Sequence, residues 1–363
     1  SALCSYCHFA RTDRHDADLR RRWAQAVIRE FDLRRRACPA LADLGAELAT
    51  VYVGGGTPSV LEPALFQRVM SRVIDRLPRD DAAEITVEAN PESFDDPVAD
   101  AWRDAGVGRV SLGVQSLDQG VLALLGRRCD PATARRALAL ACRRFDRVSA
   151  DWILGPGLTL ATVCAELDEA IGTGVEHVSL YILELHEGTP LARAVVAGEL
   201  VLPADEEVER LYLGCVEHLD RRGLRQYEVS NFARPGAESR HNQAYWLGRP
   251  YLGLGPSASG FWGRRRYTNE RHLARYLERV ERDELPEAEV DRLDRGARRL
   301  EAVILPLRTV AGVPLERLPD HALDLAAGRD RGWWTTSDGL LRLTARGFLR
   351  IDAIEAQVAR ALG

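Results

Sequence analysis

Lysine is absent from this 363-residue chain, so all 49 basic residues are arginine. Schiff-base chemistry, a phosphate-binding loop of the P-loop type and a lysine general base each need the missing amine. The sequence therefore excludes these three classes of site. A biased base composition in the source genome is the simplest explanation for the absence.

Long hydrophobic runs are also missing. No stretch reaches the roughly 18 uninterrupted apolar residues that a membrane span requires, and residues 1–11 lack the pattern of a secretory signal. The net charge of −5 and the pI of about 6.0 are unlike those of a non-specific nucleic-acid binder, which is basic. We expect no stable membrane insertion and no nucleic-acid partner.

Cysteine is sparse, with seven residues in the whole chain. A secreted disulfide scaffold would be far denser in cysteine, and an odd number does not suit complete pairing. We therefore expect reduced thiols in a cytoplasmic protein, where any closely spaced pair is a candidate metal site.

Short β-rich runs alternate with longer amphipathic segments from Thr50 to about Ser230. The expected strands are Thr50–Val53, Glu84–Ala89, Arg109–Val114, Arg147–Leu154, Glu176–Leu183 and Arg225–Val229. The expected helices include Pro63–Leu77, Pro131–Phe145, Leu160–Thr173 and Asp205–Arg222. This alternation predicts an α/β fold with a parallel, barrel-like sheet, in which the chemistry lies after the carboxyl ends of the strands.

The alternation stops after Asn231. We expect an ordered loop over residues 233–268, rich in Gly, Pro, Arg and aromatic residues, followed by a mostly helical segment over 269–363. The stretch "WWTTSDGLLRLTARG" predicts a short hairpin, which makes this unit winged-helix-like. The predicted domains are thus residues 1–232 and residues 233–363.

Two short motifs are candidates for binding. Cys4 and Cys7 form a CxxC pair that could hold a metal ion or cluster, act as a redox pair or arise by coincidence. Gly54-Gly55-Gly56-Thr57-Pro58 directly follows an expected strand, and glycines there let backbone amides approach a ligand. A tight turn that binds nothing is the alternative for this second motif.

Polar residues follow the later strands, where their side chains are expected to meet at one end of a parallel barrel. They are Glu88, Asn90, Gln115, Arg127 and Asp151. His241 lies among Tyr245, Trp246, Tyr251 and Phe261, a setting suited to a large planar ligand. A histidine in a loop is otherwise usually structural, and both roles stay open for His241.

Several motifs together resemble the radical S-adenosylmethionine family, in the group that contains oxygen-independent coproporphyrinogen III dehydrogenases and HemW heme chaperones. They are "CSYCHFA", "VYVGGGTPS", "EITVEANPES", "GVGRVSLGVQSLD", "LLGRR", "YEVSNFARPG", "SRHNQAYW" and "YLGLGPSAS". The resemblance covers essentially the whole chain. It implies a partial (β/α)6 barrel, a [4Fe-4S] cluster held by a CxxxCxxC loop, and S-adenosylmethionine bound to the fourth iron.

The resemblance also implies roles for individual residues. Cys4 and Cys7 match the second and third cluster ligands, and Tyr6 matches the aromatic residue between them. The positions that match cofactor contacts are Gly55, Gly56, Thr57, Glu88, Gln115, Arg127 and Asp151. The first cluster cysteine would lie immediately before Ser1, and the first strand would precede it. We therefore expect a chain trimmed at its N-terminus, with a genuinely degenerate family member as the alternative.

The stretches "YEVSNFARPG" and "RHNQAYW" look more like the chaperone subgroup, which binds heme. The expected function is a heme chaperone that binds the cluster, S-adenosylmethionine and heme, with His241 as a candidate heme contact, and passes heme to an acceptor protein. The alternative within the family is oxidative decarboxylation of coproporphyrinogen III. A reading from a different class is a zinc-binding structural protein or a winged-helix DNA-binding protein, and the acidic pI argues against it.

Overall fold

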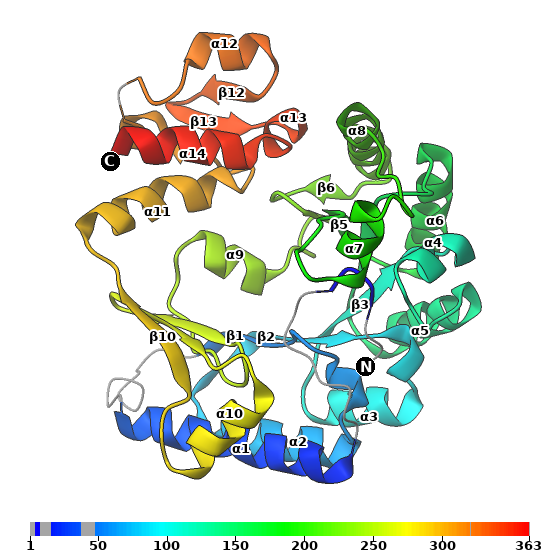
Figure 1. Cartoon of the computed structure of the whole chain (residues 1–363), viewed down its shortest axis with the longest axis vertical. Helices are drawn as coiled ribbons and strands as arrows, with labels where there is room; N and C mark the ends of the chain where they lie inside the picture. Colours follow the sequence, from blue (N-terminus) through cyan, green and yellow to red (C-terminus); the bar gives the residue numbers. More distant parts are fainter. Residues whose placement is uncertain (1–3, 8–15, 38–47, 320, 363) are drawn as a thin grey trace.

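The computed structural model describes residues 4–7, 16–37, 48–319 and 321–362. Its main sheet has seven strands in the order β1-β2-β3-β4-β5-β7-β6 and curls into a partial barrel (Figure 1). The strands are β1 Leu48–Val53, β2 Arg79–Ala89, β3 Arg109–Gln115, β4 Arg147–Leu154, β5 His177–Ile182, β6 Arg225–Gln226 and β7 Asn231–Ala233. Strands β1 to β5 are parallel, which confirms the expected α/β fold.

The far edge of this sheet differs from the expectation. The predicted strand Arg225–Val229 is shortened to β6, and β7 inserts between β5 and β6 with antiparallel pairing on both sides. The short connection of four residues between β6 and β7 explains the difference, because only antiparallel strands can be joined by so tight a turn.

Helices connect the strands and cover the outer face of the sheet (Figure 1). They are α2 Pro63–Val73, α3 Asp96–Asp104, α4 Gln119–Leu124, α5 Pro131–Arg144, α6 Leu160–Thr173, α7 Pro190–Val196 and α8 Asp205–Arg221. Local sequence sets where several of them begin. Asp130 and Thr159, for example, accept the first free amides of α5 and α6, at Thr133 and Thr162.

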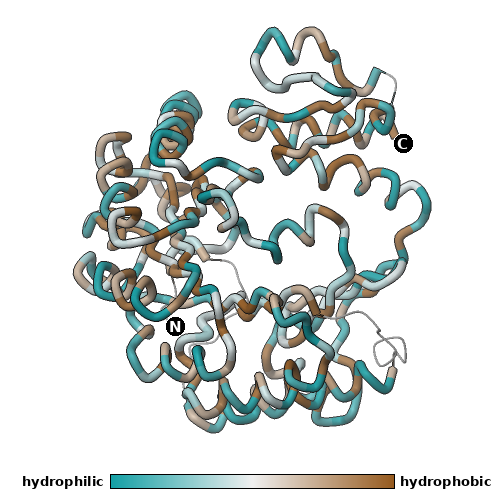
Figure 2. The backbone as a smooth tube through the Cα atoms, turned by 180° about the vertical axis from the view of Figure 1, so that it is seen from behind, coloured by the Kyte–Doolittle hydropathy of each residue, from teal (hydrophilic) through white to brown (hydrophobic). Residues whose placement is uncertain are grey.

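Strand residues alternate between the two faces of the sheet. The outer face is apolar, with residues such as Val87, Leu112 and Trp152 buried in the main hydrophobic core. The concave face is polar, and it carries Thr50, Tyr52, Glu84, Thr86, Glu88, Arg109, Ser111, Ser149, Asp151, His177, Ser179 and Tyr181. Figure 2 shows this mixture of hydrophobic and hydrophilic residues along the backbone. A polar interior is suited to a polar ligand rather than to a dry core.

The stretch 233–268, expected to be an ordered loop, contains regular structure. It holds helix α9 Arg240–Trp246 and strands β8 Ser259–Trp262 and β9 Arg265–Asn269, and β10 Glu287–Arg292 then interrupts the segment expected to be helical. Ser239 caps α9 by accepting the amide of Asn242. Strands β8 and β9 are rich in arginine and aromatic residues and do not alternate simply between apolar and polar residues, so the period-two pattern of a strand is absent from them.

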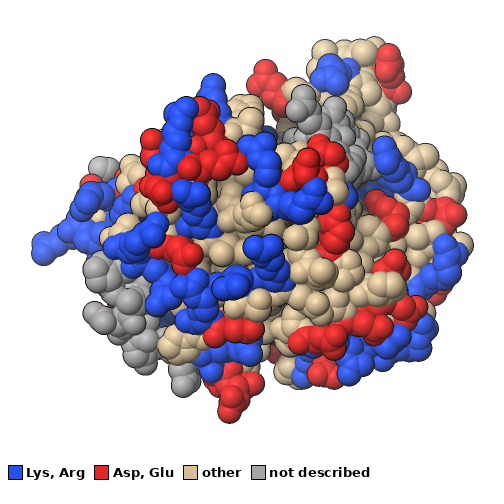
Figure 3. All heavy atoms as spheres, turned by 90° about the horizontal axis from the view of Figure 1, so that it is seen from below, with Lys and Arg blue, Asp and Glu red and all other residues tan. Residues whose placement is uncertain are grey.

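Strands β8, β9 and β10 form a second, antiparallel sheet in the order β10-β9-β8. Helices α1 Ala17–Ala37 and α10 Leu273–Glu281 lie beside this sheet. Helix α1 contacts α2 and α10, and the three form the lower layer in Figure 1. Figure 3 views the molecule from that side, with arginine and acidic side chains interspersed over the surface. Among the described residues, no helix is both long and apolar enough to cross a membrane.

The C-terminal unit has its own buried core. Its elements are α11 Arg295–Leu307, β11 Val313–Pro314, α12 Leu325–Asp330, β12 Trp334–Ser337, β13 Leu340–Leu343, α13 Ala345–Phe348 and α14 Ile351–Leu362. Strands β12 and β13 form the expected hairpin, and Asp338 and Gly339 both adopt positive φ in its two-residue turn. Helices packed on a small antiparallel sheet agree with the winged-helix-like expectation.

Candidate active site

The CxxC pair lies in a turn that is fixed to the barrel through Ser5. The amide of Ser5 donates to Leu125 O over 3.1 Å, its hydroxyl donates to Leu124 O over 2.9 Å, and its carbonyl accepts from Leu191 N over 2.9 Å. Gly126 lets the turn approach, because a Cβ there would lie 3.0 Å from Ser5 N. The turn is therefore held by the end of α4 and by the start of α7.

Arg127 connects this turn to the ends of the strands. Its guanidinium donates to Gly113 O (2.8 Å) and Asn90 Oδ1 (3.2 Å), lies 3.6 Å from Glu92, and reaches Cys4 Sγ at 3.6 Å. Burial opposes its charge, but Glu92 and the other negative groups leave the net pKa of Arg127 raised. Its Nε is buried without a hydrogen-bond partner in the described part of the chain.

The glycine motif closes over Glu88. Gly55 adopts φ +91 and donates its amide to Glu88 Oε2 over 2.8 Å, while Tyr52 donates its hydroxyl to Glu88 Oε1 over 2.6 Å. Thr57 accepts from the side-chain amide of Asn90 over 3.3 Å. Around Gly55 and Gly56, no described atom lies within 4 Å of the place a Cβ would occupy, so a ligand can reach this backbone.

Gln115 ends β3 in a conformation that residues with a side chain rarely adopt, with φ +68. Its buried side chain folds back over Gly113, where a Cβ would lie 2.8 Å from Gln115 Nε2. The β3–β4 register is irregular at this point. Strain of this kind is often found where a side chain is aimed at a ligand.

Two buried carboxyl groups hold protons more strongly than usual, Asp151 on the concave face and Glu228 in the connection between β6 and β7. Burial raises the pKa of Asp151 to about 7, against hydrogen bonds from Ser179 and Ser111 that lower it. Burial likewise raises the pKa of Glu228 to about 7, although Trp246 Nε1 donates to it over 3.0 Å. Raised carboxyl pKa values are common at functional sites.

His241 lies on the β1 side of this face and is held at both ring nitrogens. Nδ1 is 2.9 Å from Thr50 Oγ1 and Nε2 is 3.0 Å from Tyr245 Oη. The ring stacks on Tyr52 with centroids 4.8 Å apart. Burial lowers the pKa of His241 to about 4, so the ring is neutral at pH 7. Ligation of iron by His241 would require one of its two hydrogen bonds to break.

A network of hydrogen bonds therefore connects several of the sequence-predicted residues, which are Cys4, Gly55, Thr57, Glu88, Asn90 and Arg127. Arg127 links Cys4 to the strand ends at Gly113 and Asn90, and Glu88 links the glycine motif to β2. Tyr6 packs beside this group, against Val121, Leu125 and Ile153. Asp151 lies deeper on β4, and His241 is on the flank. No group of three or more Cys, His, Asp or Glu with metal-site geometry occurs among the described residues.

Sequence reasoning missed Tyr52, Tyr181 and Glu228. Tyr52 and Tyr181 extend the polar face, and the alternation Thr50-x-Tyr52 and His177-x-Ser179-x-Tyr181 is the signal that could have located them. Glu228 lies inside the motif "YEVSNFARPG", but nothing local indicates that its carboxyl would be buried against Trp246.

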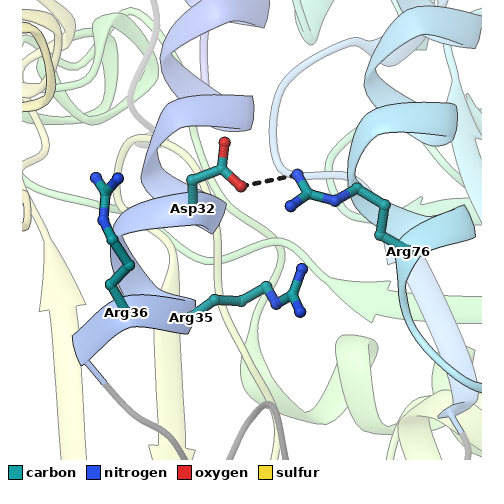
Figure 4. A pocket seen from close by; sticks show the side chains of 4 residues that line it. All are labelled: Asp32, Arg35, Arg36 and Arg76. Carbon is teal, nitrogen blue, oxygen red and sulfur yellow. Dashed lines mark hydrogen bonds and ion pairs between the residues drawn. The ribbon is translucent and has the colours of Figure 1, made fainter.

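A hollow lies on the outer layer, lined by Asp32, Arg35, Arg36 and Arg76 (Figure 4). Asp32 already accepts from Arg76 over 2.7 Å, and Arg36 lies 3.6 Å from Asp283. Exposed pairs of this kind are solvated and contribute little energy. The hollow is remote from the strand ends and is not part of the candidate site.

Comparison with known proteins shows the family of this chain. The family model described as "Radical SAM superfamily" matches residues 2–170. The heme chaperone HemW of Mycobacterium tuberculosis is 38% identical over 366 residues, covering 97% of this chain and 90% of the relative. The heme chaperone HemW of Lactococcus lactis is 31% identical, covering 87% of this chain and 81% of the relative.

A solved structure matches the whole fold. Coproporphyrinogen III oxidase (HemN) from Escherichia coli, described as a radical SAM enzyme, superposes with a TM-score of 0.80 over 98% of this chain and 87% of its own. Its sequence identity is 21%, so it supports the architecture alone. With the match to the superfamily model and the long alignments to the chaperones, this chain belongs to the HemW family of the radical SAM superfamily.

Proposed function

We propose that this protein is a heme chaperone that binds a [4Fe-4S] cluster, S-adenosylmethionine and heme, and passes heme to an acceptor protein. The observation that carries the proposal is Arg127, which holds the Cys4 turn against the strand ends at Gly113 and Asn90. These contacts support a single site that includes Cys4 and the polar strand ends. The proposal includes heme because the similar proteins are named heme chaperones.

The residues of this chain fit a [4Fe-4S] cluster and S-adenosylmethionine. Cys4 and Cys7 would supply two thiolates of the cluster, and a third is expected upstream, in keeping with the family resemblance. The open backbone of Gly55 and Gly56 with Thr57 would receive the methionine end of S-adenosylmethionine. Glu88, Gln115 and Asp151 would contact its polar groups. When bound, this cofactor pair supplies radical chemistry, which heme transfer itself does not require.

Heme has no assigned ligand in this proposal. Both nitrogens of His241 are occupied by Thr50 and Tyr245, which favours the structural of its two expected roles. Next to His241, the rings of Tyr245 and Tyr251 lie edge to face with their centroids 4.7 Å apart. These two rings offer an aromatic surface to a planar ligand. His241→Ala should leave the heme spectrum unchanged if this interpretation is right.

A reducing, cytoplasmic location is part of the proposal. Cys129, Cys142, Cys164 and Cys215 form no disulfide, and burial raises the pKa of each of these thiols, which makes them unreactive.

One experiment separates the chaperone from its alternative, the coproporphyrinogen III dehydrogenase. The chain, extended upstream to include the expected cysteine, is reconstituted with iron and sulfide under anaerobic conditions. Heme titration should give a shifted Soret band with near-stoichiometric binding. Incubation with coproporphyrinogen III, S-adenosylmethionine and a reductant should give no protoporphyrinogen. Turnover to protoporphyrinogen would replace the chaperone by the dehydrogenase.

The S-adenosylmethionine site has a matched pair of glycine variants. Gly56→Val adds a side chain to open space, so the protein should fold normally while the affinity for S-adenosylmethionine falls at least tenfold. Gly54→Val should instead destabilise the protein, since a Cβ at Gly54 lies 2.5 Å from Tyr52 and 2.6 Å from Glu88. Calorimetric titration and urea unfolding measure the two effects. Unchanged affinity in Gly56→Val would remove the glycine motif from the site.

A further inference from the structure

Tyr52 and Glu88 make a close side-chain contact between β1 and β2. The phenol donates to Glu88 Oε1 over 2.6 Å, and Gly55 N donates to Glu88 Oε2 over 2.8 Å. Each carboxylate oxygen therefore has one donor from the protein, which leaves its remaining lone pairs for a ligand. The contact is tight, because Gly54 has no room for a Cβ beside either side chain.

The ring of Tyr52 is itself held in place from α9. His241 stacks on it at 4.8 Å with an interplanar angle of 17°. The N-terminus of α9 is fixed by Glu84, whose carboxylate accepts from His241 N over 3.0 Å and from Arg240 N over 3.3 Å. Strand β2 thus uses Glu84 to hold α9 and Glu88, four residues later on the same face, to hold the glycine motif.

We infer that Tyr52 is a positioning residue, which orients the Glu88 carboxylate toward the cationic amino group of an amino-acid ligand at the glycine motif. The inference deepens the proposed S-adenosylmethionine site and rests on it for the identity of the ligand. A hydrogen bond to a carboxylate fixes its direction and stabilises its charged form in a buried place. Without the phenol, Glu88 would keep only the Gly55 amide.

The surroundings of Glu88 predict how its titration changes. Burial raises the pKa of Glu88, and the hydrogen bonds from Tyr52 and Gly55 lower it. Asp151 from β4 and Tyr181 from β5 also face this group within electrostatic range, and both stay in place when Tyr52 is altered. Removal of the phenol should therefore raise the pKa of Glu88 further.

The test compares two buried tyrosine–glutamate hydrogen bonds. Tyr52→Phe removes the bond to Glu88 and keeps the ring on His241, whereas Tyr276→Phe removes the 2.8 Å bond from Tyr276 to Glu30, between α10 and α1. Carboxyl ¹³C NMR of glutamate-labelled protein, with Glu88 assigned by Glu88→Gln, should show the pKa of Glu88 rising by about one unit in Tyr52→Phe only. Calorimetry on the cluster-loaded, upstream-extended chain should show S-adenosylmethionine binding about tenfold more weakly in Tyr52→Phe only.

The two readouts separate this inference from the proposed function. An unchanged Glu88 titration in a folded Tyr52→Phe protein overturns the positioning role. Equal loss of affinity in Tyr52→Phe and Tyr276→Phe also overturns it, since a general effect on stability would then explain both. A shifted titration in a protein that binds no S-adenosylmethionine supports the positioning of Glu88 and overturns the proposed ligand alone.

Discussion

Asp151 illustrates what the polar concave face does to a single side chain. It lies on β4 with Ser111 and Ser179 beside it, and burial raises its pKa to about 7. An aspartate in an unfolded chain titrates near 4. The folded state therefore binds the proton more tightly than the unfolded state does, and stability falls as the pH rises from about 4 to 7.

Asp151→Asn should remove this dependence on pH, because asparagine keeps the polar contacts and carries no charge. The variant should match the parent protein near pH 4, and its free energy of unfolding should exceed the parent's by roughly 2 to 4 kcal/mol above pH 7. Urea unfolding between pH 4 and 8 measures the difference.

Asp130 is the control for this series. It caps α5 from the surface by accepting from Thr133 N, and this hydrogen bond lowers its pKa. Asp130→Asn should therefore show no stability gain that grows between pH 4 and 8. A gain in Asp130→Asn equal to that in Asp151→Asn would contradict the role assigned to burial.

At the scale of elements, α1 makes buried ion pairs within itself and to β10, and an exposed ion pair to α10. Arg34 and Glu30 on α1 are 4% and 0% exposed, and Arg34 reaches Glu287 over 2.8 Å and Asn269 over 2.8 Å. Arg22 on α1 pairs with Glu281 on α10 over 2.8 Å in solvent. Helix α1 thus allows the two kinds of pair to be compared.

Arg34→Met should lower the free energy of unfolding by about 3 to 5 kcal/mol, because it leaves the Glu30 carboxylate buried without its cation. Arg22→Met should cost at most about 1 kcal/mol. The double variant Glu30→Gln with Arg34→Met should recover part of the loss, since no buried charge is then left unpaired. Urea unfolding tests the series, and equal losses in the two single variants would refute the distinction.

At the scale of the whole molecule, the buried residues divide into a main core under the large sheet and a separate core in the C-terminal unit. The links between them include the hydrogen bond from Val229 N to Arg308 O at 2.8 Å, the ion pair between Arg346 and Glu209 at 2.9 Å, and the packing of Ala345 and Leu349 against the main core. In Figure 1 the C-terminal unit lies at one end of the molecule, with α9 between it and the lower layer.

Trp334→Ala should destabilise the C-terminal unit and leave the barrel folded. Trp334 is 3% exposed and lies against Gly328, where a Cβ would be 1.8 Å away, so its truncation removes about 3 to 5 kcal/mol of packing energy from that core. Hydrogen exchange should accelerate over residues 295–362 and stay unchanged in β1 to β5. Leu325→Ala, which alters a 37% exposed side chain nearby, is the control.

Uniform acceleration over the whole chain would instead show that the two cores unfold together. The predicted division after residue 232 is a proposal that the same experiment addresses.

Local sequence was sufficient for the parallel strands, the helices between them and the terminal hairpin. Alternating apolar residues, Asp and Thr caps and the Asp338-Gly339 turn act over a few residues, so they can be read without knowing the fold. The polar residues that follow the strands also predict a site that includes Glu88, Gln115, Arg127 and Asp151, because the order of strands and helices can be read along the chain. The motifs pointed to the family for the same reason, since they lie in the chain as continuous stretches.

Tertiary structure alone decided which of these groups meet and in what state. Tyr52 reaches Glu88 across 36 residues, and His241 reaches Thr50 across 191 residues, so neither partner could be chosen from neighbours in the chain. The same holds for the insertion of β7 beside β5 and for the raised pKa values of Asp151 and Glu228, which depend on burial by distant segments. Burial and long-range pairing are properties of the packed molecule, because they arise only when separate elements exclude water from one another.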